Sequence, residues 1–88
     1  MGHVFHPGHH ELHGITVVVE TSGTRTYVGR FDHEDSAGVH LLDVATHDAV
    51  DGSSREEYLE RTARLGVRAD RKHVIVPRPE IAAIRRLG

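Results

Sequence analysis

The stretch that decides the fold is "RKHVIVPRPEIAAIRRL", residues 71–87. It holds two short apolar runs, residues 74–76 and 81–84, and the first alternates with a two-residue period as a β-strand does. Pro77 and Pro79 lie between the runs, and neither has an amide hydrogen to donate to a strand ladder. Each proline also favours extended geometry in the residue before it. The stretch therefore predicts two strands, 71–77 and 81–86, joined by a stiff, sharp corner at the outer edge of a sheet.

Three further strands are expected upstream of this corner. They are the β-branched run "ITVVVE" at 15–20, "TRTYVGRFDHE" at 24–34 and "VHLLDVATH" at 39–47, with turns at 21–23 and 35–38. Gly29 inside the second strand indicates a bend or a close backbone approach. The sequence thus predicts a mainly β fold: a five-stranded, strongly bent antiparallel sheet that forms a small open barrel of the SH3-like kind.

Residues 53–66 change to a helical period. A capping box is available as Ser53 with Glu56 or as Ser54 with Glu57, and Gly66 supplies a stop. The predicted helix has Tyr58, Thr62 and Leu65 on one face, beside Leu59 and Ala63. The expected organisation is a His-rich arm with a short helix at about 7–13, then one domain over 14–88 with the 53–66 helix inserted between strands three and four.

Composition limits the function classes. The chain has 88 residues, no cysteine and a formal net charge of −2, so disulfides are excluded and a core this small favours oligomerisation. Residues 1–52 carry two basic against eight acidic residues, whereas residues 53–88 carry nine basic against five acidic. No apolar run is long enough for a membrane span and no signal peptide is evident, which predicts a cytoplasmic location. No nucleophile triad or glycine-rich phosphate loop stands out, and an enzyme is not expected.

The chain resembles the Sm-like superfamily, which comprises the Sm, LSm and bacterial Hfq proteins. The first family motif is matched by an aromatic, a glycine, an apolar residue, a turn aspartate and an apolar strand, namely Tyr27, Gly29, Phe31, Asp35, Leu41 and Leu42. The second motif is matched by Val74, Val76, Ile81 and Ile84, and the Lys72-His73 pair is similar to the Hfq version of it. The resemblance spans residues 12–87, and the 53–66 helix takes the place of the family's variable loop.

The resemblance implies a homo-oligomeric ring of roughly five to seven subunits in which the fourth strand of one subunit pairs with the fifth strand of the next. Val74, Val76, Ile81 and Ile84 then belong to the oligomer edge strands. The chain also departs from the family. The base-reading Asn is replaced near Gly38, Val39 and His40, the Arg-Gly by Pro77-Arg78, and an aromatic by Glu34. These departures weaken the inference of RNA binding more than the inference of fold.

Four residues are predicted to contact single-stranded RNA: Lys72, His73, Arg78 and His40. The resemblance places Lys72 and His73 at the ring pore, although they can equally be the polar start of a strand. Arg78 on the stiff corner can meet a phosphate, or it can be a solvated turn arginine.

The N-terminal histidines suggest metal binding. His9 and His13 are four residues apart and would share a helix face, with His6 and His10 on an adjacent face. Zinc or nickel is the expected ion, and the alternative is a polar arm without a ligand. Three functions therefore stay open: an RNA-binding Sm-like ring, a ring that binds a protein partner through the 53–66 helix without RNA, and a metal-binding module.

Overall fold

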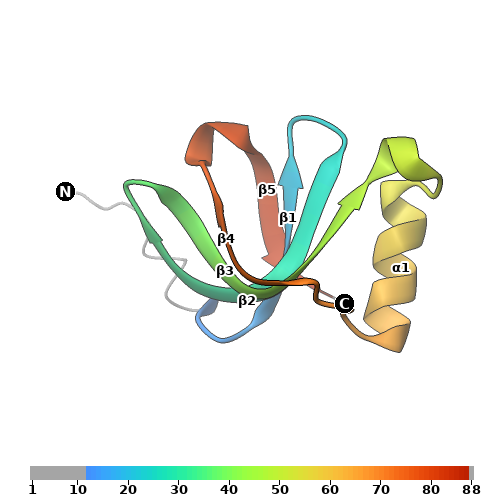
Figure 1. Ribbon diagram of the computed structural model, residues 1–88, viewed down its shortest axis with the longest axis horizontal. Helices are drawn as coiled ribbons and strands as arrows, with labels where there is room; N and C mark the ends of the chain where they lie inside the picture. The colour runs from blue at the N-terminus through green and yellow to red at the C-terminus, as the bar shows by residue number, and fades with distance from the viewer. Residues whose placement is uncertain (1–11, 88) are drawn as a thin grey trace.

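The computed structural model describes residues 12–87, which form five strands and one α-helix. The elements in order are β1 (Thr16–Thr21), β2 (Arg25–Asp35), β3 (Gly38–Asp48), the 3-10 helix η2 (Ala49–Asp51), α1 (Arg55–Leu65), β4 (Arg71–Val76), the 3-10 helix η3 (Arg78–Glu80) and β5 (Ile81–Arg86) (Figure 1). All strand pairs are antiparallel, in the order β4-β3-β2-β1-β5. The predicted mainly β fold and the inserted helix are confirmed. The helix expected at 7–13 falls mostly on residues 1–11, outside the described part of the chain.

The sheet is open, and β4 and β5 are its two edge strands. In residues 12–87, β4 pairs only with β3, and β5 pairs only with β1. The predicted corner between them is η3, which follows Pro77 in extended geometry. The β2–β3 turn packs closely on this corner, because a Cβ built on Gly38 would lie 2.3 Å from the Val76 carbonyl oxygen. The long strands β2 and β3 lie between β4 and β1 in the strand order, and both are strongly curved (Figure 1).

Two apolar clusters stabilise the sheet from its two faces. The larger cluster contains Val17, Val19, Phe31, Val39, Leu41, Val44 and Val76. The smaller cluster contains Val18, Val28 and Leu59. β1 is therefore buried on both faces, which explains its unbroken run of valines. The four residues predicted for the edge strands direct their side chains to the larger cluster: Val76 is part of it, and Val74, Ile81 and Ile84 pack against it.

Helix α1 covers the smaller cluster. The Ser54 hydroxyl accepts from the Glu57 amide and the Glu57 carboxylate accepts from the Ser54 amide, so the second of the two predicted capping boxes is the one formed. These hydrogen bonds lower the pKa of Glu57. The Arg55 guanidinium holds the helix against the start of β2 and the β1–β2 turn, because it donates to the Thr26 hydroxyl at 2.6 Å and to the Gly23 carbonyl at 3.0 Å.

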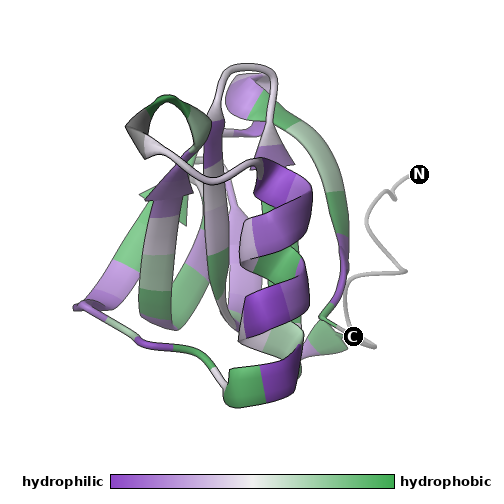
Figure 2. Ribbon diagram, turned by 90° about the vertical axis from the view of Figure 1, so that its right-hand side faces the viewer, coloured by the Kyte–Doolittle hydropathy of each residue, from purple (hydrophilic) through white to green (hydrophobic). Residues whose placement is uncertain are grey.

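Only part of the predicted apolar face of α1 is buried in the chain. Leu59 and Thr62 are buried, but Leu65 is 71% exposed and Ala63 is exposed. The helix contacts Val18 and Val28 through Leu59, and its last turn lies clear of this apolar surface. Hydrophilic residues cover most of the outward side of α1 (Figure 2). In residues 12–87, no helix combines the length and the apolarity that crossing a bilayer requires.

Candidate functional site

The candidate site begins with a β-bulge in β2. Phe31 pairs with Leu41 and His33 pairs with His40, so Asp32 is an extra residue on the β2 side. An unbroken strand would place Phe31 and His33 on the same face. The bulge instead leaves Phe31 in the core and places His33 beside His40 on the other face, in line with the general role of bulges in re-aiming side chains.

His40 is the buried centre of the site, with 8% of its surface exposed. Its Nδ1 lies 2.9 Å from His73 Nε2 on β4, and its Nε2 lies 2.9 Å from Asp35 Oδ2 at the end of β2. The His40 ring stacks on His33 at a centroid distance of 4.0 Å and on His73 at 5.1 Å. Three strands thus bring three imidazoles and a carboxylate together. We call His33, Asp35, His40 and His73 the His–Asp cluster.

His33 is held from both sides by carboxylates. Its Nδ1 lies 2.7 Å from Asp32 Oδ2, and its Nε2 lies 3.5 Å from Asp35 Oδ2. The hydrogen bond to Asp32 is the main cause that raises the pKa of His33, and Asp35 adds to it. The same hydrogen bond lowers the pKa of Asp32. The raised pKa makes the imidazolium form of His33, in which both ring nitrogens donate, more favourable than it is for a free histidine.

Asp35 is fixed by the β2–β3 turn. Its Oδ1 accepts from the Ala37 amide at 2.9 Å, which leaves Oδ2 to face the Nε2 atoms of both His33 and His40. The pKa of Asp35 is lowered, first by the hydrogen bond with His40 and then by the turn amides. The ligand atoms of His33, Asp35 and His40 all lie within 4.8 Å of one another, and N and O donors of this kind suit zinc.

The structure brings together two of the four residues predicted for RNA contact, His40 and His73. Lys72 is exposed beside His73 on β4. Arg78 is engaged by Glu34: its Nε lies 2.8 Å from Glu34 Oε2, and its Nη2 bonds Oε1 of the same carboxylate. The Glu34 side chain is only 7% exposed. This bidentate pair ties the β4–β5 corner to the end of β2.

Of the histidines predicted to bind metal, only His13 is described. Its Nδ1 lies 2.7 Å from the Asp32 carbonyl oxygen, so it contacts the bulge that forms the cluster. His6, His9 and His10 lie outside the described residues, and metal binding by them stays a prediction.

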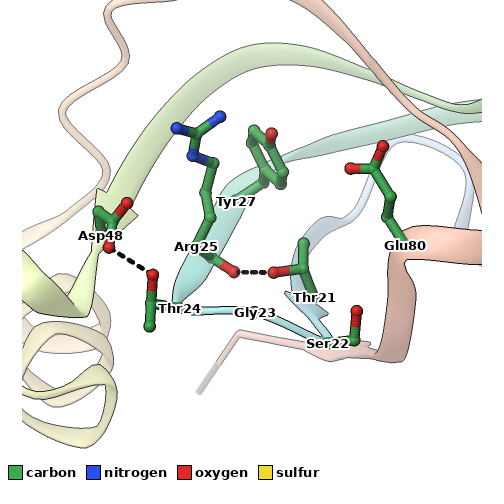
Figure 3. A pocket seen from close by; sticks show the side chains of 8 residues that line it. All are labelled: Thr21, Ser22, Gly23, Thr24, Arg25, Tyr27, Asp48 and Glu80. Carbon is green, nitrogen blue, oxygen red and sulfur yellow. Dashed lines mark hydrogen bonds between the residues drawn. The ribbon is translucent and has the colours of Figure 1, made fainter.

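A separate polar pocket of about 280 Å³ lies between the β1–β2 turn, β2 and η3 (Figure 3). Its polar groups bond one another: the Thr24 hydroxyl donates to Asp48 Oδ1 at 2.6 Å, and the Thr21 hydroxyl donates to the Arg25 carbonyl at 2.6 Å. A hydrogen bond with Tyr27 raises the pKa of Arg25, and the charges of Asp48 and Glu80 add to this effect. Because Thr21 and Thr24 already have partners and, among residues 12–87, no group of metal ligands is brought together here, this pocket is a weaker candidate than the His–Asp cluster.

Reasoning from the sequence missed His33, Asp35 and Asp32 as site residues. A signal for one contact was present, because a turn centred between Ser36 and Ala37 places residues 33 and 40 opposite each other. The Asp32 bulge itself has no such signal, since it depends on how β2 pairs with β3.

The comparisons with known proteins inform the fold alone. No family model matches the chain, and no curated protein matches it. A chain in a crystal structure of the NatC complex bound to CoA is similar, with a TM-score of 0.57 and 21% identity. The similarity covers 94% of this chain and 86% of that chain. The two chains are therefore close in length and share the arrangement of their strands.

Proposed function

We propose that this chain is a subunit of an Sm-like homo-oligomeric ring that binds single-stranded RNA. The observation that carries the proposal is that β4 is an outer strand of an open sheet and also bears the exposed Lys72 and His73. Pairing of β4 with β5 of a neighbouring copy would repeat the Lys72-His73 pair once in each subunit around the ring.

The two edge strands of the sheet support ring assembly. An outer strand has a row of backbone groups without a strand partner, and such an edge tends to pair with another chain. The edges here differ, since one is β4 and the other is β5. A contact between two different edges is heterologous, and it closes into a ring when the rotation between subunits allows. Ile75 on β4 is 41% exposed, and such a contact would reduce its exposed surface.

The side chains on and beside β4 support an RNA ligand. Lys72, His73 and His40 lie on adjacent strands, and Arg78 is on the corner that follows β4. To bind a phosphate, Arg78 would have to exchange the Glu34 carboxylate for it. We therefore assign Arg78 a smaller contribution to RNA affinity than Lys72. The function proposed is binding, with no catalytic step.

Lys72→Ala tests this proposal. The Arg64→Ala variant is its control, because Arg64 is an exposed cation in the last turn of α1. Binding of a short fluorescent single-stranded RNA is measured against salt for both variants and the wild type. Each phosphate contact contributes roughly 0.7 to the slope of log affinity against log salt for single strands. Lys72→Ala should weaken binding and flatten this slope, and Arg64→Ala should change neither. RNA binding that is undetectable at low salt, or equal in Lys72→Ala and wild type, would refute the RNA function.

The second candidate is a ring that binds a protein through α1 and does not bind RNA. It is favoured by the exposure of Leu65 and Val50, at 71% and 73%. A groove of about 750 Å³ also runs beside Leu65 and Tyr58. The RNA titration distinguishes the two candidates, because only the first requires a salt-dependent nucleic-acid complex.

A further inference from the structure

We propose that His33, Asp35 and His40 form a zinc site, with Nε2, Oδ2 and Nε2 as the respective ligand atoms. This site goes beyond RNA binding and differs from the N-terminal histidines considered from the sequence. Its ligands come from both strands of the β2–β3 hairpin, and the pairing of His33 with His40 fixes them on one face.

The distances from Asp35 Oδ2 are close to those of a tetrahedral site, and rotation of one of the two stacked rings, which lie 18° from parallel, would bring both Nε2 lone pairs to the ion. With zinc–ligand bonds of about 2.0–2.2 Å, two ligand atoms of a tetrahedral site are roughly 3.3–3.5 Å apart. Asp35 Oδ2 lies 3.5 Å from His33 Nε2 and 2.9 Å from His40 Nε2. The fourth position would be left to water, as in other zinc sites with three protein ligands.

Both histidine ligands have a partner for the ring nitrogen that would not bind the ion. Metal-binding histidines usually donate the other ring nitrogen to a partner that fixes the tautomer and the ring orientation. His33 Nδ1 faces Asp32 Oδ2 at 2.7 Å, and His40 Nδ1 faces His73 Nε2 at 2.9 Å. Both Nε2 atoms lie within 3.5 Å of the same carboxylate oxygen, Asp35 Oδ2.

Asp35 has the matching support. Its Oδ1 is occupied by the Ala37 amide at 2.9 Å, and only Oδ2 faces the histidines. Each of the three ligands is thus held by a neighbour that is not itself a ligand. Zinc binding at these atoms requires each Nε2 that faces Asp35 Oδ2 to be free of hydrogen, so any proton that it carries is released to solvent when the ion binds.

Asp35→Asn tests the site, with Asp43→Asn as the matched control. Both side chains are largely exposed, at 45% and 59%, so both variants should fold. Asp43 is on the same hairpin and has a positive φ of 51°, which asparagine tolerates. The full chain is titrated with Zn²⁺ against a chromophoric chelator, and circular dichroism verifies folding. Wild type and Asp43→Asn should bind one zinc per chain with equal affinity, whereas Asp35→Asn should bind at least about tenfold more weakly.

A second variant separates this site from the N-terminal arm. In it His6, His9 and His10 are replaced by alanine, and the His–Asp cluster is intact. This variant should keep the zinc, and its Co²⁺ form should show the strong visible absorption of a four-coordinate site. Zinc binding that is lost in the arm variant and unchanged in Asp35→Asn would overturn the proposal. Equal affinities in wild type and Asp35→Asn would also overturn it.

Discussion

Gly38 shows how one residue can hold the β2–β3 turn against the β4–β5 corner. Its φ is 140°, a conformation that residues with a side chain rarely adopt. Its missing Cβ also leaves room for the backbone of Val76 and Pro77, which a Cβ would approach to 2.3 Å and 2.9 Å. The turn that fixes Asp35 therefore depends on a glycine at this position.

We predict that Gly38→Ala lowers the free energy of unfolding by about 2–4 kcal/mol, through backbone strain and overlap with Val76. Gly23→Ala is the control, because Gly23 has open space around its Cβ position and no positive φ. Its effect should stay within about 1 kcal/mol in either direction. Urea denaturation of both variants gives the comparison. Similar stabilities for the two would show that the β2–β3 turn moves freely off the corner.

The site residues show what a sequence can reveal at this scale. His40, Lys72 and His73 were predicted as RNA contacts from the residues and the resemblance, and His40 and His73 do lie in contact. His33 was missed because the alternation that begins at Phe31 assigns it to the core face. Only the extra residue at Asp32 reverses that assignment, and its presence depends on the pairing partner.

At the scale of elements, α1 depends on its first turn. The sequence left two capping boxes open, because Ser53 and Ser54 each have a glutamate three residues later. The structure uses Ser54, which places Arg55 as the first helical residue, where it reaches Thr26 and Gly23. The start of the helix and its anchor to the sheet are thus set together.

Ser54→Ala should lower the free energy of unfolding by about 1 kcal/mol, the usual cost of removing an N-cap side chain. Ser53→Ala, a substitution at the adjacent residue, is the control. The Ser53 contact with His47 Nε2, at 3.0 Å, uses the backbone carbonyl, so the alanine side chain leaves this contact in place. Thermal unfolding followed by circular dichroism measures both. If Ser53→Ala cost more than Ser54→Ala, the capping box would be assigned to the wrong serine.

Element boundaries were largely predictable. The fifth strand was predicted at 81–86 and found there, and no boundary of the other strands shifted by more than one residue. Valine runs and turn residues carry this information locally. The exposure of Leu65 was not predictable in the same way. A helical period shows which residues share a face, but the extent of the sheet beneath them determines how many are covered.

For the whole molecule, the open sheet leads to a prediction of mass. If β4 and β5 of neighbouring copies pair, light scattering should give a multiple of the 9.8 kDa chain mass. Ala83→Lys places a charge on exposed β5, a substitution that opposes edge pairing, and it should reduce the mass toward that of one chain.

Ala63→Lys makes the same change on the exposed side of α1 and should leave the mass unaltered. A wild-type mass of 9.8 kDa at every concentration would rule out the ring. It would leave the zinc proposal standing, because all three ligands belong to one chain.

The pairing of β1 with β5 has a consequence for synthesis on the ribosome. β1 is buried on both faces and lies between β2 and β5 in the sheet. Its second partner is translated more than 60 residues after it, with Val17 opposite Arg86 and the Leu87 amide donating to the Thr16 carbonyl at 3.1 Å. The β1–β2–β3 meander therefore emerges with one side of its most apolar strand unpaired until β5 leaves the exit tunnel. During that interval β1 is an open edge that chaperones or another nascent copy can contact, so native folding is completed only after translation of the last strand.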